Sequence, residues 1–260
     1  MPPAPAAPLT VYPLGDIPEV RPGDDLPRLV WAAVQQANIG LAPGDVLVVT
    51  QKIVSKAEDA RVRLDTIQPS RQARAWAEAW GHDPRQVELV LRESKRIVKM
   101  QRGLIIAETR HGYICANAGI DLSNAGEPGI ALLLPADPDA SARRLREGLR
   151  ALSGQDVAVI VSDSFGRPWR QGLTQVALGV SGLQALLDLR GEHDADGRRL
   201  HGTLIALADE LADAADLVSS KTARIPAALI RGYRGPRTDK KGREGTGKDL
   251  LRPPEEDLFR

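Results

Sequence analysis

The sequence lacks the features of several large classes of protein. Its 260 residues include one cysteine, Cys115, so no disulfide can form within the chain and we expect a reducing, cytoplasmic setting. Phe, Trp and Tyr make up only 3% of the residues, which argues against a surface that stacks the bases of single-stranded nucleic acid. The 35 Lys and Arg residues almost balance the 34 Asp and Glu residues, so a net charge of +1 gives no general attraction to nucleic acid or to an anionic membrane. No apolar run approaches the roughly 18 residues of a membrane span.

The chain is long enough to bury a substantial hydrophobic core in one large domain. Its N-terminus, MPPAPAAPLT, has neither the charged nor the apolar region of a secretory signal, and we expect a disordered leader over residues 1–8. We predict one folded domain over residues 9–233. After Arg231 the sequence becomes polar, basic and rich in glycine, and we interpret residues 234–260 as a mobile C-terminal tail.

Segments with the periodicity of strands and of helices follow one another irregularly. We predict strands at residues 9–14, 45–50, 104–108, 113–116, 130–134, 157–161 and 227–230. We predict helices at residues 26–38, 70–80, 87–98, 137–152 and 203–218. Because these elements do not form a regular βαβ alternation, we predict an α+β fold with a mixed sheet rather than a doubly wound fold.

The most informative stretch is VAVIVSDSFGRPWRQG, residues 157–172. A buried strand at 157–161 is followed at once by Ser162, Asp163 and Ser164, where we expect the strand to end in a turn. A carboxylate and a hydroxyl together suit a hard cation such as Mg²⁺. Arg167 and Arg170 suit phosphate or carboxylate, because the guanidinium fork matches those anions. The alternative is a capped turn with surface arginines, but the crowding of these groups favours a binding site.

Two further pairs of residues suit the same chemistry. Lys52 and Lys56 follow the predicted strand that ends at Thr50, so they are placed to hold phosphates or to form a solvated edge. Asp121 and Asn124 lie in a loop that contains glycine, where they could bind a metal and a nucleotide or form a simple Asx turn.

Other motifs are weaker. The sequence GREGTGK at 242–248 matches seven places of a phosphate-binding P-loop, but Asp249 stands where Ser or Thr is needed and no strand precedes it, so we reject that function. One cysteine and four histidines cannot form a structural zinc site. His111 and Cys115 could form a nucleophilic pair, although a cysteine half-buried in a strand is the simpler interpretation.

Taken together, four segments resemble the coenzyme F420-0:L-glutamate ligase family. They are VLVVTQKIVSKAE (46–58), GYICANAGIDLSN (112–124), SDSFGRPWRQG (162–172) and LLRPPEEDLF (250–259). The resemblance covers nearly the whole chain after the leader, with the segments in the same order. It implies that residues 9–233 are a gamma-glutamyl ligase catalytic domain.

The resemblance implies an enzyme that joins L-glutamate to the terminal carboxylate of coenzyme F420-0, and then adds further γ-linked glutamates to coenzyme F420-1. GTP is the co-substrate and yields GDP and phosphate. Mg²⁺ or Mn²⁺ occupies two sites, and K⁺ assists. The implied fold is the α+β ligase-like fold of an intertwined homodimer, with no nucleic acid or membrane partner. The apolar segment 176–187 also suggests surface for such a dimer.

The implied site residues fall into three groups. The first metal matches Asp121 and Asp163, and the second matches Ser164 and a position near Lys221. The nucleotide contacts match Asp16, Ile17, Pro18, Glu19, Gln51, Lys52, Lys56, Asn124, Ser219, Ser220, Lys221 and Thr222. Among these groups and their neighbours, we assign catalytic roles to Asp163, Arg167 and Lys56.

The chain departs from the family pattern at Gln175, where Asp or Asn is common, and at Lys221, which cannot bind a metal while it is protonated. Two alternatives to the ligase therefore stay open. One is a non-catalytic nucleotide-binding protein on the same fold, and the other is a ligase for a different carboxylate acceptor. The residues themselves favour a ligase, because a carboxylate and a triphosphate repel each other unless cations neutralise them.

Overall fold

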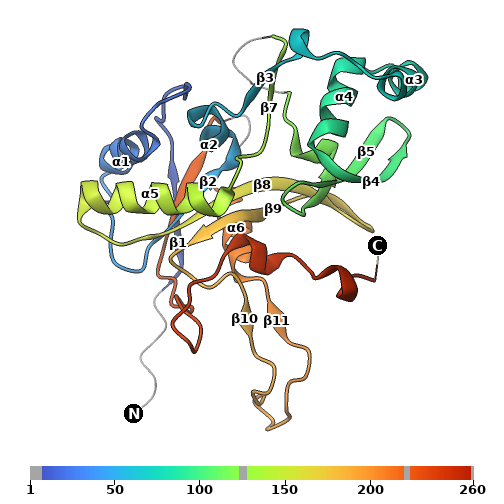
Figure 1. Cartoon of the computed structure of the whole chain (residues 1–260). Coiled ribbons are helices and arrows are strands. Elements are labelled where there is room, and N and C mark those ends of the chain that lie inside the picture. The colour runs from blue at the N-terminus through green and yellow to red at the C-terminus, as the bar shows by residue number, and fades with distance from the viewer. Residues whose placement is uncertain (1–7, 123–127, 220–222, 259–260) are drawn as a thin grey trace, which may run out of the picture.

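The computed structural model describes residues 8–122, 128–219 and 223–258. Its helices and mixed sheets confirm the predicted α+β class (Figure 1). The largest element is a five-stranded sheet in the order β1-β12-β2-β8-β9. These strands are β1 (Thr10–Leu14), β12 (Ala227–Arg231), β2 (Val46–Thr50), β8 (Ala158–Arg167) and β9 (Arg170–Ser181).

Helices cover both faces of this sheet (Figure 1). They are α1 (Leu26–Gln36) and α5 (Pro138–Ser153) on one face, and α6 (Leu207–Asp216) on the other. Along β8, Val159 and Val161 join the core under α1 and α5, whereas Ala158 and Ile160 join the core under α6. Successive strand residues point to opposite faces. Burial on both faces explains why the central strands are continuously apolar in sequence.

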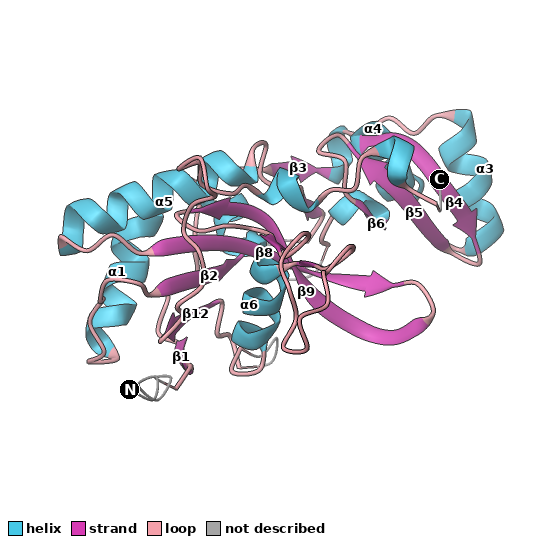
Figure 2. Ribbon diagram, turned by 90° about the horizontal axis from the view of Figure 1, so that it is seen from below, coloured by secondary structure: helices cyan, strands magenta, loops and turns pink. Residues whose placement is uncertain are grey.

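A smaller unit lies at one end of the molecule (Figure 2). It consists of α3 (Arg71–Trp80), α4 (Pro84–Glu93) and a three-stranded sheet of β4 (Ser94–Gln101), β5 (Leu104–Thr109) and β6 (Ile114–Ala116). Ala73, Val87 and Ile105 belong to its core. The remaining elements are α2 (Gln51–Ala57), the pair β3 (Arg61–Arg63) and β7 (Ile130–Leu132), and the projecting pair β10 (Leu187–Asp188) and β11 (Leu204–Ile205).

Three boundary predictions are wrong. The helix predicted over 203–218 begins only at Leu207, because Leu204–Ile205 is a short strand that pairs with β10. The helix predicted over 87–98 ends at Glu93, and the chain continues as β4, because residues 94–101 pair with β5. The turn predicted at Ser162, Asp163 and Ser164 does not form either. β8 runs on to Arg167 and pairs with β9, so these polar residues lie within a strand (Figure 2).

The segment 176–187 does not provide the dimer surface that its apolar character suggested. Ala177, Leu178, Val180 and Leu183 are each at most 3% exposed, because β9 and the loop after it contribute to the core of the same chain. Two exposed apolar side chains lie instead on the β8–β9 hairpin, where Trp169 is 82% and Leu173 is 60% exposed. A homodimer would therefore have to use a surface other than the segment 176–187.

The described part of the segment after residue 233 packs against the main sheet and does not extend freely as a mobile tail would. The backbone N–H of Gly245 donates to Leu183 O at 2.9 Å, and that of Gly247 donates to the buried Asp139 carboxylate at 2.7 Å. A Cβ on Gly247 would lie 2.0 Å from Leu178 O, so the close contact requires glycine. Because the Gly247 N–H is already used, this segment does not cradle a phosphate as a P-loop does. The domain limits at 8 and 233 stay predictions.

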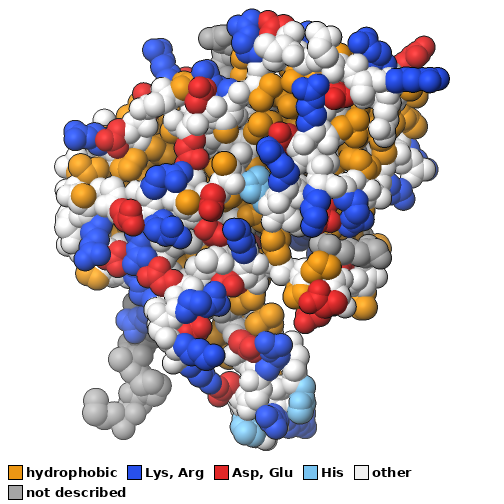
Figure 3. All heavy atoms as spheres, in the orientation of Figure 1, with side chains coloured by type: hydrophobic (Ala, Val, Ile, Leu, Met, Phe, Trp, Pro, Cys, Tyr) orange, Lys and Arg blue, Asp and Glu red, His pale blue; other side chains and the backbone are white. Residues whose placement is uncertain are grey.

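The surface agrees with the balanced composition. Figure 3 shows Lys and Arg side chains interspersed with Asp and Glu on the visible face. In the part of the chain that the structure describes, no helix combines the length and the apolar character needed to cross a membrane.

Candidate active site

Four segments that carry candidate site residues meet at one edge of the main sheet. Strand pairing aligns Leu14 with Ala227, Ala227 with Val49, and Val49 with Val161. The carboxyl ends of β1 and β2, the middle of β8 near Val161 and the amino end of β12 therefore lie side by side. The loop 16–19 follows β1, α2 follows β2, and Asp163 follows the last residues of β8 that pair with β2. Ser219 and residues 223–226, the described residues nearest in sequence, precede β12. The sheet thus gathers residues from four distant parts of the sequence.

Helix α2 presents three candidate residues at this edge. Gln51 is its first residue and is 3% exposed, and its side-chain Oε1 accepts a hydrogen bond from Ser55 Oγ at 2.8 Å. Lys52 and Lys56 are four residues apart, so they lie on the same side of the helix. Lys56 is buried and forms an ion pair with Glu19. This pair joins α2 to the loop 16–19.

The loop 16–19 contains the first predicted nucleotide contacts. Asp16 adopts a positive φ of 54°, a conformation that turns the chain sharply after β1. Asp16, Pro18 and Glu19 are exposed, whereas Ile17 packs against the core under α1 and α5. The loop is therefore anchored by Ile17 and leaves its polar groups at the sheet edge.

Lys52 brings the next candidate, Asp121, to the same place. Lys52 Nζ lies 2.6 Å from Asp121 Oδ2, and both side chains are about three-quarters buried, at 28% and 23% exposure. The backbone of Asp121 is fixed by two hydrogen bonds with Leu132, of 3.0 and 2.8 Å. The Asp121 carboxylate is therefore held rigidly beside the start of α2.

Asp163 lies on the face of β8 that is turned toward the smaller unit. Its Oδ1 accepts a hydrogen bond from the Ser164 N–H at 2.8 Å. Burial, and then the negative charge of Asp163, raise the pKa of the Cys115 thiol to about 12, which places Asp163 near β6. The raised pKa keeps Cys115 protonated, so it is not an activated nucleophile. His111 is not its partner, because His111 Nε2 lies 2.9 Å from Pro135 O.

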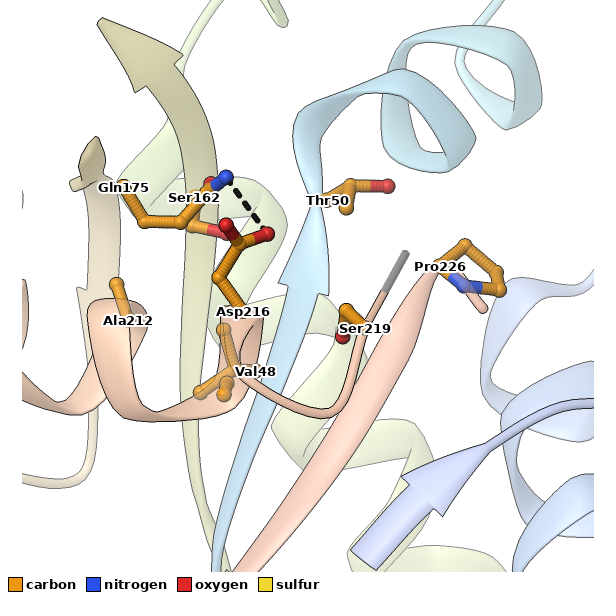
Figure 4. A pocket seen from close by; sticks show the side chains of 9 residues that line it. Val48, Thr50, Ser162, Gln175, Ala212, Asp216, Ser219 and Pro226 are labelled. Carbon is orange, nitrogen blue, oxygen red and sulfur yellow. Dashed lines mark hydrogen bonds between the residues drawn. The ribbon is translucent and has the colours of Figure 1, made fainter. Parts of the chain in front are cut away.

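Ser164 points to the opposite face of β8 from Asp163. Its Oγ accepts a hydrogen bond from Gln175 Nε2 at 2.7 Å, and the same Nε2 donates to Asp216 Oδ1 of α6 at 3.0 Å (Figure 4). Neighbouring residues of a strand project to opposite sides. The three predicted metal ligands therefore belong to two separate places, with Asp121 and Asp163 on one face of the sheet and Ser164 on the other.

The residues present suit divalent ions only in part. In the described ranges, no three His, Cys, Asp or Glu side chains converge as a metal cluster. Mg²⁺, however, is usually held by one or two carboxylates together with substrate phosphates and water. Asp121 and Asp163 fit that pattern, with Lys52 now neutralising Asp121.

Arg167 is not brought to Asp163 within this chain. It is exposed at the tip of the β8–β9 hairpin, and its guanidinium is 3.5 Å from Gln171 O. Four strand residues span roughly 13 Å, so Arg167 lies about that far from Asp163 along β8. Four other predicted contacts, Asn124, Ser220, Lys221 and Thr222, lie outside the described residues. Ser219 is described and lines a small cavity beside Asp216 (Figure 4).

Sequence analysis missed the acidic side of α6. Asp209, Asp213 and Asp216 follow one another at intervals of four and three residues, so they share one side of the helix. Asp209 and Asp213 each accept a hydrogen bond of 2.8 Å from a backbone N–H of β9, at Ala177 and Gln175. The spacing of the aspartates was the available signal.

Comparison with known proteins shows which chains this one is similar to. A family model described as F420-0:Gamma-glutamyl ligase matches residues 15–232. A protein of Methanopyrus kandleri named Coenzyme F420:L-glutamate ligase is 46% identical over 243 residues, which cover 93% of this chain and 94% of the relative. Proteins with the same name from Methanothermobacter thermautotrophicus and Methanocaldococcus jannaschii are both 44% identical. They cover 94% and 86% of this chain, and 96% and 88% of their own lengths.

Proposed function

The chain belongs to the F420-0:gamma-glutamyl ligase family, and we propose that it joins L-glutamate to the terminal carboxylate of coenzyme F420-0. Further rounds would add γ-linked glutamates to coenzyme F420-1. The observation that carries this proposal is the convergence of the loop 16–19, α2, Asp121 and Asp163 at one sheet edge. That edge combines the cations and carboxylates which phosphoryl transfer between anions requires.

The proposed reaction has two steps. An oxygen of the acceptor carboxylate attacks the γ-phosphorus of GTP, the bond from that phosphorus to the β–γ bridging oxygen breaks, and GDP leaves. The amine nitrogen of L-glutamate then attacks the acyl carbon of the resulting acyl phosphate. An amide forms, inorganic phosphate leaves, and the nitrogen loses a proton. Neither step needs a covalent enzyme intermediate, which agrees with the protonated state of Cys115.

Lys52 and Lys56 are proposed to hold the phosphates of GTP, with Gln51, Ser219 and the loop 16–19 contacting the rest of the nucleotide. Both lysines now pair with carboxylates, so their charges are already held at the sheet edge. Asp121 and Asp163 would bind Mg²⁺ or Mn²⁺, which neutralises phosphate charge when bound. Ser164 would contribute to a second metal position on the other face. Asn124, Ser220, Lys221 and Thr222 remain predicted nucleotide contacts.

We further propose that the enzyme is a cytoplasmic homodimer. The exposed Trp169 and Leu173 of the β8–β9 hairpin favour a partner surface there. In such a dimer Arg167, which is remote from Asp163 of its own chain, would act from the hairpin. Sedimentation that shows only the 28.0 kDa species at micromolar concentration would contradict the dimer.

The decisive assay measures GDP release from GTP in the presence of Mg²⁺ or Mn²⁺. We expect release that requires both a deazaflavin acceptor and L-glutamate, with the glutamylated product identified by mass. GTP binding without release would support the non-catalytic alternative. Release with another carboxylate acceptor, but not with coenzyme F420-0, would support the different ligase.

A further inference from the structure

The C-terminal segment, residues 244–251, runs along the outer edge of β9 (red in Figure 1). β9 is the last strand of the main sheet, so only one of its edges pairs with another strand of that sheet. At the other edge, the Val180 N–H donates to Asp139 Oδ1 at 2.9 Å, and the Gly247 N–H donates to the same oxygen at 2.7 Å. The buried Asp139 carboxylate therefore joins the segment to β9.

Two further sets of contacts fix the course of this segment. The Glu244 carboxylate accepts a hydrogen bond from the Gly182 N–H at 2.9 Å and pairs with Arg146 at 2.7 Å. Thr246 and Asp249 form a capping box, in which the side chain of each accepts a hydrogen bond from the backbone N–H of the other. This reciprocal pair begins a short 3₁₀ helix over Gly247–Leu250. The segment therefore has a defined conformation up to its last two leucines.

These two leucines, Leu250 and Leu251, pack against different groups of apolar side chains. Leu250 packs against the core under α6. Leu251 packs against a separate buried cluster, and a Cβ on Gly112 would lie only 3.1 Å from its Cδ1. We call this group the Tyr113 cluster, and its buried members are Tyr113, Leu134 and Leu178.

The Tyr113 cluster also supports the two apolar neighbours of Asp163 on its own face of the sheet. Phe165 is two residues further along β8, so its side chain projects to the same face as Asp163. Val176 of β9 is paired with Asp163 and shares that face. Both Phe165 and Val176 pack against the cluster, and the Phe165 ring meets the Tyr113 ring edge-on, with centroids 6.4 Å apart. Leu251 thus helps to bury the side chains that flank Asp163.

Packing matters at Asp163 because β8 loses one of its neighbouring strands there. Ser162, opposite Thr50, is the last residue of β8 that pairs with β2. From Asp163 onward, β9 is the partner of β8 among the described strands. The backbone N–H of Ser164 donates to Asp163 Oδ1 and not to a strand. A two-stranded ribbon is only marginally stable by itself, so the packing of its apolar face determines how rigidly it is held.

We propose that Leu251 is a positioning residue for Asp163. It acts through the Tyr113 cluster, which holds Phe165 and Val176 and thereby the strand that carries the carboxylate. Leu250, its neighbour in sequence, packs with the core under α6 and has no such role. The expected effect on turnover rests on the proposed function, whereas the positioning itself rests on this packing.

The test compares Leu251→Ala with Leu250→Ala, because each variant removes the same side chain from a different face. The first measurement is hydrogen exchange of the Ser164 N–H in the whole protein, without metal, nucleotide or substrate. This exchange reports on the hydrogen bond to Asp163 Oδ1. We expect exchange about tenfold faster than in wild type for Leu251→Ala, and within about twofold of wild type for Leu250→Ala. Leu251→Met, which refills the space, should restore the wild-type rate.

Thermal melts, together with exchange of the Val159 N–H in the middle of the sheet, measure the general loss of stability in each variant. Equal acceleration at Ser164 in the two alanine variants would overturn the proposal. Acceleration at Ser164 that only matches the acceleration at Val159 would overturn it as well. If Leu251→Ala fails to fold, Leu251→Val against Leu250→Val makes the same comparison, with a difference of about threefold expected.

The second measurement is Mn²⁺-dependent turnover with saturating acceptor and L-glutamate. Leu251→Ala should lower kcat about tenfold and raise the Mn²⁺ concentration for half-maximal turnover, with the KM for GTP within about twofold of wild type. Leu250→Ala should keep all three values. Faster exchange at Ser164 in Leu251→Ala, with no ligase activity in wild type, would defeat the proposed function alone. Ligase activity in wild type, with unchanged exchange at Ser164 in Leu251→Ala, would defeat the positioning role alone.

Discussion

Asp163 and Ser164 are neighbours in sequence, but they lie on opposite faces of β8. The two faces differ in the groups that pair with their carboxylates. On the Asp163 face, Lys52 pairs with Asp121 at 2.6 Å, and Lys56 pairs with Glu19. On the Ser164 face, the carboxylates of α6 accept only N–H donors among the described residues. The first face therefore places lysines beside its carboxylates, while the carboxylates of the second face pair with no described Lys or Arg.

Under the proposed function, this difference assigns different roles to the two faces. Lysines beside carboxylates suit a site that receives phosphates, since they attract an anionic nucleotide. Carboxylates without lysines do not offer that attraction. Variants that alter one face should therefore leave the properties of the other largely intact.

The largest expected effect is on the Asp163 face. Asp163→Asn should keep the fold, because the Asn oxygen can still accept the hydrogen bond from the Ser164 N–H. Loss of the charge should weaken divalent metal binding and cut turnover at least a hundredfold, which is about 2.7 kcal/mol of barrier. Asp121→Asn should act in the same way. Metal titration and single-turnover GTP cleavage measure these effects.

Thermal melts provide the folding control for both variants. Near-normal turnover in Asp163→Asn would show that the carboxylate only caps a backbone N–H.

The second largest expected effect tests the role of Lys52 in nucleotide binding. Lys52→Met removes the cation beside Asp121 while keeping most of the side-chain volume. GTP binding should weaken about tenfold, the value of one charge-assisted hydrogen bond. Mn²⁺ binding without nucleotide should be as tight as in wild type or tighter, because Lys52 no longer competes for Asp121. Calorimetry of both ligands tests this opposite pair of results, and parallel weakening of both would contradict it.

The sequence was sufficient for the fold class and for most strands, whereas the site near Asp163 stays a prediction. Apolar runs such as 157–161 predict strands well, because a strand that is buried on both faces must be apolar along its whole length. The continuation of β8 through Ser162, Asp163 and Ser164 carried no such signal. It depends on pairing with β9, and polar residues are stable in a strand when side-chain and backbone partners from elsewhere satisfy them.

The network of Gln175 was hidden for a related reason. Its partners Ser164 and Asp216 are 11 and 41 residues away, so only the pairing of β8 with β9 and the packing of α6 on β9 bring them together. The packed C-terminal segment was missed because glycine and charge are typical of mobile tails, whereas here Gly247 is needed for close approach to Leu178. In both cases the tertiary partner, and not the local sequence, determines the structure.

A smaller effect is expected at Ser164. Ser164→Ala removes the acceptor of the Gln175 hydrogen bond and one proposed oxygen ligand. The divalent metal concentration for half-maximal turnover should rise several-fold, with little change in GTP affinity. Ser164→Thr, which keeps the hydroxyl, should restore the wild-type value. If Ser164→Ala and Ser164→Thr behave alike, the hydroxyl has no role in metal use.

The smallest expected effect tests the uncompensated charge of α6 through pH. Burial first, and the charge of Asp213 second, hold the pKa of Asp209 above its ordinary value of 3.8. The folded protein therefore binds this proton more tightly than the unfolded chain. The ionised carboxylate begins to cost stability as pH rises above 3.8, and the whole cost is present above the raised pKa.

Asp209→Asn keeps an acceptor for the Ala177 N–H and removes that cost. Its Tm at pH 7 should exceed that of wild type by about 2 °C, and the difference should vanish near pH 3, where Asp209 is protonated in both states. Melts of both proteins across this range measure the effect. A variant less stable than wild type at pH 7 would mean that the hydrogen bond to the ionised carboxylate outweighs the cost of its burial.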